Sequence, residues 1–92
     1  MSVYVDEPIW SYKRMKMCHM VADTPDELHE MANLLGLKRH WFQGGNFSLP
    51  HYDICKSKRA LAIKYGAIEI DKYKLVEMIK ANRDKKAKQD QP

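Results

Sequence analysis

The 92-residue sequence contains no long hydrophobic run and little cysteine. A membrane-spanning helix needs about 20 consecutive apolar residues, and no stretch of this chain approaches that length. The opening segment, MSVYVDEPIW, has neither the basic start nor the apolar middle of a secretory signal peptide. The two cysteines, Cys18 and Cys55, form no CxxC pair, so we expect reduced thiols. These absences predict a cytoplasmic protein with no membrane partner.

Two familiar kinds of binding motif are also missing. The glycines of QGGN, residues 43–46, have the spacing of neither a Walker phosphate-binding loop nor a dinucleotide-binding turn. The histidines and cysteines lack the paired spacing that is typical of a zinc site. We therefore expect no obligatory cofactor, and any phosphate site must be built without a glycine-rich loop.

The net charge of +4 is unevenly distributed. Residues 80–92 hold five Lys or Arg against two Asp, whereas residues 1–79 hold eleven basic and ten acidic side chains. We expect one domain over residues 1–82 and a basic, flexible tail over residues 83–92. Inside the domain, residues 38–64 carry six basic side chains and one acidic one. That local excess favours an anion site and gives less support to general nucleic-acid binding.

Hydrophobic patterning predicts a single small α/β domain. Its clearest element is a helix that begins with the capping box of Thr24 and Glu27, has Pro25 in its first turn, and ends at Gly36. The alternation of strands and helices favours about four mainly parallel strands, with three helices packed on the sheet. The other predicted elements are strands at 2–6, 17–23, 37–42 and 67–70, a helix at 58–65 capped by Ser57, and a helix capped by Asp71 with Leu75, Val76 and Ile79 on its inner face.

Residues 43–56, QGGNFSLPHYDICK, are predicted to form a long loop, and long loops in small domains are often functional. In open sheets of parallel strands, ligands bind beyond the carboxyl ends of the strands. Asp6 and Asp23 each end a predicted strand, and His51 and Asp53 lie in the predicted loop. If the strands are parallel, these four residues gather on one edge of the sheet.

His51 is the best candidate for chemistry, because an imidazole titrates near neutral pH and can act as a general acid or base. His19, in the second predicted strand, or Asp53 would assist it. The alternative for His19 is a hydrogen-bonded core side chain, and the alternative for His51 is a loop ordered by local hydrogen bonds. His29 lies beside the apolar stripe of its helix, so we expect it to be solvated.

Lys58 and Arg59 stand at the start of the second predicted helix, where the helix dipole favours negative charge. A phosphate bound to the free N–H groups of that turn would make both cations favourable. Simple solvation is the alternative, because the dipole costs each cation only about 0.3–1 kcal/mol. An aromatic ring can stack on a nucleobase, although packing at the edge of the core is its alternative role. The residues predicted to contact the ligand are Ser57, Lys58, Arg59, Arg39, Tyr52 and Trp10.

The carboxylates of Asp6, Asp23 and Asp53 offer a competing site for Mg²⁺, of the kind that supports metal-dependent phosphoryl transfer. Two of them have a simpler alternative. Asp23 adjoins a helix cap, and Asp6 can merely end a strand.

Three segments resemble those of a small bacterial and phage family, the domain of unknown function 4031. They are VYVDEPIW at 3–10, CHMVAD at 18–23 with the helix ending in LLGL at 34–37, and PHYDICKSKRALAIKYGAIEI at 50–70. The resemblance covers roughly residues 2–80 and leaves out the tail. The family name records no activity, so the resemblance assigns no catalytic residue and implies only a bacterial or phage cytoplasmic setting.

Together these expectations favour a protein that acts on a nucleotide or another phosphate-bearing small molecule. The leading hypothesis is a phosphodiesterase that cleaves a cyclic or linear nucleotide by histidine acid–base chemistry, and the phage setting suggests a nucleotide signal of host defence. One alternative is a non-catalytic oligomer that sequesters such a nucleotide. Another is a nucleic-acid accessory protein that uses the tail and the basic region 38–64. We expect a homo-oligomer, because a domain this small gains stability from association.

Overall fold

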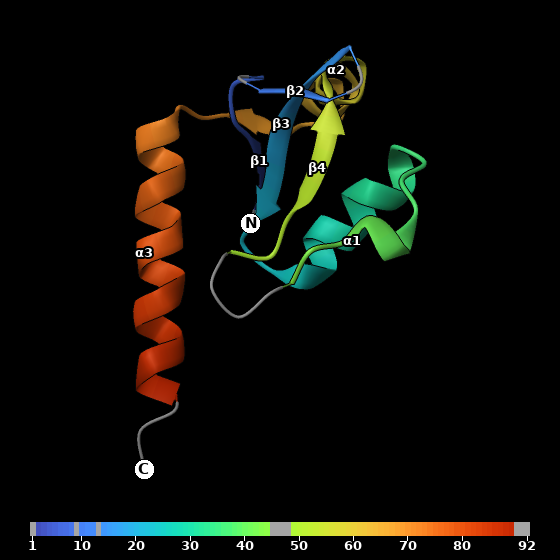
Figure 1. The fold of residues 1–92 in the computed structure, drawn as a ribbon. Helices are drawn as coiled ribbons and strands as arrows, with labels where there is room; N and C mark the ends of the chain where they lie inside the picture. The colour runs from blue at the N-terminus through green and yellow to red at the C-terminus, as the bar shows by residue number, and fades with distance from the viewer. Residues whose placement is uncertain (1, 9, 13, 45–48, 90–92) are drawn as a thin grey trace.

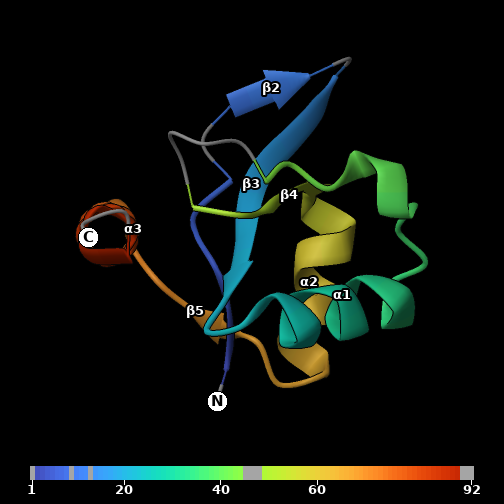
Figure 2. The same cartoon turned by 90° about the horizontal axis from the view of Figure 1, so that it is seen from below.

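A single mixed sheet forms the centre of the molecule (Figure 1). The computed structural model describes the backbone of residues 2–8, 10–12, 14–44 and 49–89, and the side chains of these residues except 10–12 and 83–89. Helices α1 and α2 cover one face of the sheet, and α3 lies on the opposite side (Figure 2). The elements are β1 (Val3–Val5), β2 (Trp10–Tyr12), β3 (Met15–Ala22), α1 (Pro25–Leu34), the 3-10 turn η1 (Arg39–Trp41), β4 (Tyr52–Cys55), α2 (Lys56–Lys64), β5 (Ile68–Glu69) and α3 (Lys72–Gln89).

The predicted α/β class is confirmed, but the prediction of mainly parallel strands is wrong. Strand β3 is central and pairs antiparallel with β1, β2 and β4, and within the described part of the chain only the β1–β5 pair is parallel. The short chain between β1 and β3 explains this arrangement, because a parallel connection needs a crossover of about a dozen residues or more. That chain instead contains β2, which forms a hairpin with the start of β3 beside Arg14, a residue with φ of 68°.

The hydrophobic core lies between the sheet and the α1–α2 layer. Alternate side chains of a strand point to opposite faces, so β3 sends Cys18 and Met20 into this core. Strand β4 contributes Tyr52 and Ile54 in the same way. The stripe of α1 predicted from the sequence packs against them, and its Leu28 is 1% exposed. Burial raises the pKa of the Cys18 thiol to about 12, so this side chain acts as a small apolar group.

Two predicted elements are wrong between α1 and α2. Residues 37–42 form no strand. Leu37 is buried, and the exposed η1 follows it. The three residues of η1 are polar or aromatic and offer no alternating apolar face, which a half-buried strand requires. The predicted loop at 43–56 contains β4, whose buried and half-buried positions alternate with the period of a strand. Only four residues alternate in β4, and the proline at position 50 and the lysine at position 56 leave no longer apolar pattern around them. A pair of backbone hydrogen bonds between Gln43 and His51 closes the remaining loop.

Most predicted helix ends are confirmed. The Thr24 hydroxyl accepts a hydrogen bond from the Glu27 backbone N–H at 3.3 Å, and Gly36 follows α1 with φ of 74°. The Asp71 carboxylate accepts one from the Lys74 N–H at 2.8 Å. The cap predicted for α2 is wrong, because that helix begins directly after β4 with Cys55 as its N-cap and no side-chain cap bond.

Helix α3 contacts the rest of the domain through its first turns. Leu75 is buried and Ile79 is half-buried, as predicted for the inner face of this helix. The prediction is wrong for Val76, which is 47% exposed. The helix runs to Gln89 and crosses the predicted domain boundary at residue 82. The flexibility of the tail stays a prediction, because residues 90–92 and the side chains of 83–89 lie outside the described part of the chain. No helix of the described residues has the length and apolar character that a membrane crossing requires.

Candidate functional site

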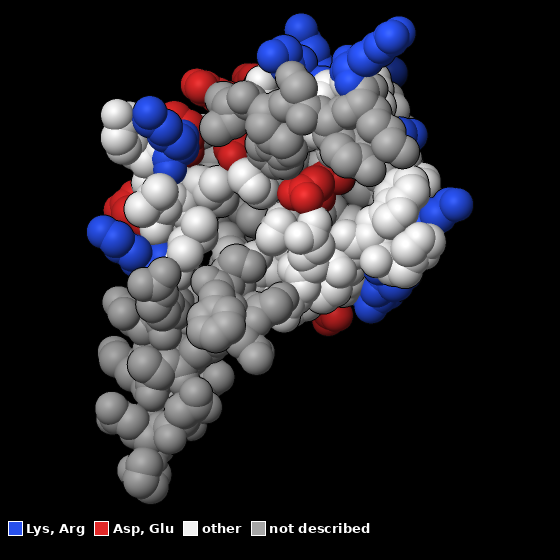
Figure 3. All heavy atoms as spheres, viewed as in Figure 1, with Lys and Arg blue, Asp and Glu red and all other residues white. Residues whose placement is uncertain are grey.

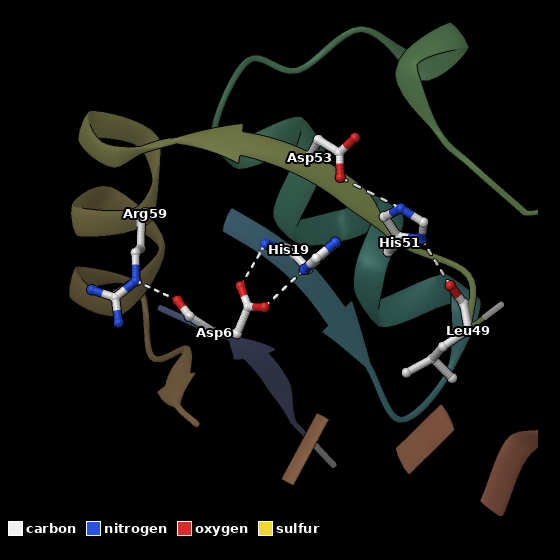
Figure 4. A network of polar contacts seen from close by, with 6 residues as sticks. All are labelled: Asp6, His19, Leu49, His51, Asp53 and Arg59. Carbon is white, nitrogen blue, oxygen red and sulfur yellow. Dashed lines mark hydrogen bonds and ion pairs between the residues drawn. The ribbon is translucent and has the colours of Figure 1, made fainter. Parts of the chain in front are cut away.

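The buried Asp6 and the half-buried His19 form a polar pair where β1 ends beside β3. Asp6 is 2% exposed. Its Oδ1 accepts a hydrogen bond from the His19 backbone N–H at 2.6 Å. Its Oδ2 lies 2.8 Å from His19 Nδ1 (Figure 4). The hydrogen bond to Asp6 raises the pKa of His19, although burial of the ring opposes that effect. Asp6 therefore sets the orientation of the imidazole and favours its protonated form.

His51 and Asp53 approach the same place from β4 and the residue before it. His51 Nδ1 donates to the Leu49 carbonyl oxygen at 2.8 Å, and its Nε2 lies 3.4 Å from Asp53 Oδ1. The other carboxylate oxygen of Asp53 accepts a hydrogen bond from Gln43 Nε2 at 2.6 Å. His51 and Asp53 are two residues apart on an extended chain, so both side chains stand on the face opposite to the core.

Strand register brings these two halves together. His19 and Asp53 are directly opposite in the β3–β4 ladder, and the rings of His19 and His51 are 5.3 Å apart at an angle of 73°. His19, His51 and Asp53 each offer a donor atom, and these atoms all lie within 4.8 Å of one another. We call these three residues the β3–β4 cluster. The three residues predicted to be catalytic therefore do lie side by side.

A small apolar cavity of about 90 Å³ adjoins the β3–β4 cluster. The rings of His19 and His51 form part of its wall, and the remainder is aliphatic. A larger hollow of about 410 Å³ lies along α1 near Glu27 and Tyr65, and none of the candidate catalytic residues lines it. Sequence reasoning missed the side chains that complete the site. They are Gln43, Val21, Leu49, Leu75 and Ile79.

The family described as "Protein of unknown function (DUF4031)" matches residues 3–82, most of the chain. The chain belongs to the DUF4031 family. This finding confirms the resemblance seen in the sequence. Neither the curated proteins nor the solved structures gave a match. The chemistry of this DUF4031 domain therefore has to be argued from its own residues.

The carboxylates of the DUF4031 domain do not gather on one edge as predicted. Asp23 accepts hydrogen bonds from the Ser2 N–H at 2.8 Å and the Tyr4 hydroxyl at 3.1 Å, beside the start of β1. Asp6 follows the end of β1. The expectation failed because β1 and β3 are antiparallel, which places their carboxyl ends at opposite edges. Among the described residues, the group with the spacing of a metal site is the β3–β4 cluster and not the predicted trio of aspartates.

Lys58 and Arg59 are engaged elsewhere in the fold. Lys58 Nζ donates to the Leu35 carbonyl at 2.8 Å, at the end of α1, where the helix dipole favours a positive charge. Arg59 Nε donates to the Asp6 carbonyl at 2.7 Å, and its Nη2 lies 3.1 Å from Glu69 Oε1. Both cations thus join elements of the domain through these bonds.

Among the other predicted ligand contacts, Tyr52, Arg39 and Ser57 do not belong to the β3–β4 cluster. Tyr52 is fully buried, and its hydroxyl is hydrogen-bonded to His29 Nδ1 at 2.9 Å. His29 is therefore not the solvated side chain that was expected: its ring packs on Phe42 with centroids 4.6 Å apart, and burial lowers its pKa. Arg39 and Ser57 are exposed, in η1 and α2 respectively. The side chain of Trp10 lies outside the described part of the structure.

On the face drawn in Figure 3, Lys and Arg lie at separate points around the margin and do not merge into one patch. An electrostatic footprint for nucleic acid normally needs such a patch or stripe. The β3–β4 cluster is thus a better candidate for function than the overall basic charge.

Proposed function

We propose that the protein hydrolyses a phosphoester bond in a small phosphate-bearing ligand, with nucleotides as the substrate class. His19, His51 and Asp53 would carry the reaction. The observation that supports this proposal is the convergence of two imidazoles and one carboxylate, from paired strands, beside a cavity. Groups that accept and donate protons within reach of one reacting centre are what general acid–base catalysis requires.

The hydrogen bonds at Nδ1 assign a role to each ring. The Leu49 carbonyl can only accept, so His51 carries its proton on Nδ1 and presents Nε2 as the basic nitrogen. In the proposed reaction His51 takes the proton from water or from a ribose hydroxyl as that oxygen attacks phosphorus. His19, held by Asp6, gives a proton to the oxygen of the leaving group as its bond to phosphorus breaks. Positioned proton transfer of this kind typically contributes about 10²–10⁴-fold in rate.

The charge of the phosphate needs a partner in this site. Lys58 and Arg59, the cations expected to bind it, donate to backbone carbonyls within the domain. The proposal therefore assigns this task to protonated His19, which Asp6 stabilises across 2.8 Å. Once Nε2 of His51 carries the transferred proton, it would donate a hydrogen bond to Asp53 Oδ1, 3.4 Å away, so Asp53 would stabilise the imidazolium.

The test is incubation of the purified protein with a mixture of cyclic and linear nucleotides in the presence of EDTA, followed by chromatographic separation of products. We expect new products from the wild type and a loss of at least about 10²-fold in rate for His51→Ala, the scale of one lost general base. His40→Ala is the matched control, because His40 is an exposed histidine in η1. Recovery of intact bound nucleotide without any product would overturn hydrolysis and support the sequestering alternative. The predicted homo-oligomer and the nucleic-acid partner stay predictions.

A further inference from the structure

Both imidazoles of the β3–β4 cluster are bonded through Nδ1 to an oxygen. The partner of His19 is the Asp6 carboxylate at 2.8 Å, and the partner of His51 is the Leu49 carbonyl at 2.8 Å. An oxygen acceptor requires the N–H form at Nδ1, which places the lone pair of each neutral ring on Nε2. Histidines that bind metals show this arrangement almost always, since the outer oxygen fixes both the tautomer and the ring orientation.

Asp53 supplies an independent indication. Its Oδ1 is buried and has no hydrogen-bond partner among the described residues, whereas Oδ2 is bonded to Gln43. The neighbouring atom, 3.4 Å away, is His51 Nε2. In the neutral form of His51 a nitrogen lone pair therefore faces a carboxylate oxygen, which is a repulsive contact that a shared cation would relieve. A buried polar atom without a partner indicates an additional group at that position.

We propose that His19, His51 and Asp53 bind one divalent transition-metal ion of the zinc class. With zinc–ligand bonds of about 2.0–2.1 Å, the ligand atoms of a tetrahedral site are about 3.3–3.4 Å apart. The His51 Nε2 to Asp53 Oδ1 distance of 3.4 Å already has that value, and all three donor atoms fall within 4.8 Å. Three protein ligands leave the fourth position for water or a ligand, as in catalytic zinc sites.

The donor set favours late transition metals over Mg²⁺. Two imidazole nitrogens and one carboxylate suit Zn²⁺, Cu²⁺, Ni²⁺ or Fe²⁺, whereas Mg²⁺ prefers an all-oxygen shell. The sequence spacing concealed this site because its ligands come from two paired strands. His19 and Asp53 are opposite each other in the β3–β4 ladder although 34 positions separate them in the chain. No local motif records such a pairing.

The proposed metal site does not depend on the proposed hydrolysis, because binding is measured without a substrate. The nitrogens that transfer protons in that reaction are the nitrogens that would bind the ion. Metal coordination and histidine acid–base chemistry therefore exclude one another at this cluster, and the loaded and metal-free forms can be compared directly.

The experiment removes metals from the full chain with a chelator, dialyses the chelator away, and titrates Zn²⁺ or Mg²⁺ while heat release is recorded. We expect one Zn²⁺ per chain and no Mg²⁺ binding in the same concentration range. His51→Ala and Asp53→Asn should each weaken zinc binding by more than the about 10–100-fold that loss of an outer-shell partner causes. Asp6→Asn should fall within that 10–100-fold range. His40→Ala and Cys55→Ser, which remove a surface imidazole and the accessible thiol, should leave the affinity unchanged.

A second measurement needs no variant. Co²⁺ added to the metal-free wild type should produce visible absorption typical of a four-coordinate nitrogen–oxygen site, without the near-ultraviolet band of a thiolate ligand. Absence of retained zinc and of a cobalt spectrum, with nucleotide turnover intact, would overturn the metal site alone. Zinc that binds and stops turnover supports both proposals. Turnover that requires zinc supports the metal site and overturns the acid–base mechanism.

Discussion

The two faces of β3 differ in chemistry although their residues alternate along one short strand. Cys18 and Met20 on one face are completely buried against the α1–α2 layer. His19 and Val21 on the other face line the small cavity under α3. We call the first the closed face and the second the open face. Two helices cover the closed face. The cavity on the open face is lined by Leu49 and by Leu75 and Ile79 of α3, and it adjoins the half-buried β3–β4 cluster.

In this small domain, one face of the sheet stabilises the fold and the other face carries the candidate site. Burial of apolar area stabilises the fold through the closed face. The polar groups of the open face are held by specific bonds to carboxylate and carbonyl oxygens, as at Asp6 and Leu49. Substitutions on the closed face should therefore affect stability first, and those on the open face should affect binding or chemistry first.

The largest expected effect is on the closed face. Met20→Ala removes a fully buried side chain and should lower the free energy of unfolding by about 2–5 kcal/mol. Val21→Ala, the adjacent change on the open face, removes two heavy atoms instead of three from the wall of an existing cavity and should cost less. Urea denaturation followed by circular dichroism measures both. Equal losses for the two variants would contradict the asymmetry of the faces.

The next largest effect concerns the one fully buried carboxylate on the open face. Asp6→Asn leaves a single oxygen acceptor for the two N–H groups of His19, so one of them meets an amide donor. The loss of one buried hydrogen bond should cost about 1–3 kcal/mol. It should also lower the pKa of His19, measured by NMR titration of the metal-free protein, because the hydrogen bond to Asp6 is the main cause of its elevation. An unchanged His19 titration would show that Asp6 does not hold the ring.

A smaller effect on stability tests whether Lys58, beside the closed face, has a structural role or binds a ligand. Lys58→Met keeps the apolar stem but loses the hydrogen bond to the Leu35 carbonyl, and should cost about 0.5–1.5 kcal/mol. Lys16→Met, at an exposed lysine of β3, is the matched control and should leave stability unchanged. Nucleotide turnover should survive in both. Unchanged stability of Lys58→Met together with lost nucleotide binding would restore the phosphate-binding role predicted from the sequence.

The smallest effect is a dependence of stability on pH. It arises from the hydrogen bond between Tyr52 and His29, a polar contact on the closed-face side of the sheet. Burial lowers the pKa of His29, so the unfolded chain binds its proton more readily than the native protein does. The stabilising contribution is therefore present above the unfolded pKa of about 6.5 and is lost as pH falls through the lower native value. His29→Gln keeps an acceptor for the Tyr52 hydroxyl without titrating. The stability difference between wild type and variant should shrink on acidification below pH of about 6.5, and a constant difference would contradict this account.

Local sequence signals predicted the elements that depend on local physics. The capping box at Thr24, the left-handed glycine at 36 and the cap at Asp71 need only neighbouring residues, and the structure confirms all three. The choice of His19, His51 and Asp53 as a group also came from residue types, since few other side chains near the predicted loop can transfer protons. The structure places their donor atoms within 4.8 Å of one another, and their chemical role stays a proposal.

The tertiary structure decided the directions of the strands and the hydrogen-bond partners of the charged side chains. Strand pairing is a long-range choice, so alternation of elements could not reveal that β3 runs antiparallel to β1 and β4, and Asp23 was placed at the wrong edge. The targets of Lys58 and Arg59 are likewise carbonyls distant in the chain, which helix-dipole reasoning about α2 alone could not find. By itself the sequence determined both ends of α1, the start of α3 and the residues able to do chemistry, because these follow from short-range geometry. The tertiary structure decided which of those residues meet, because register and packing bring together groups whose separation in sequence carries no record of the contact.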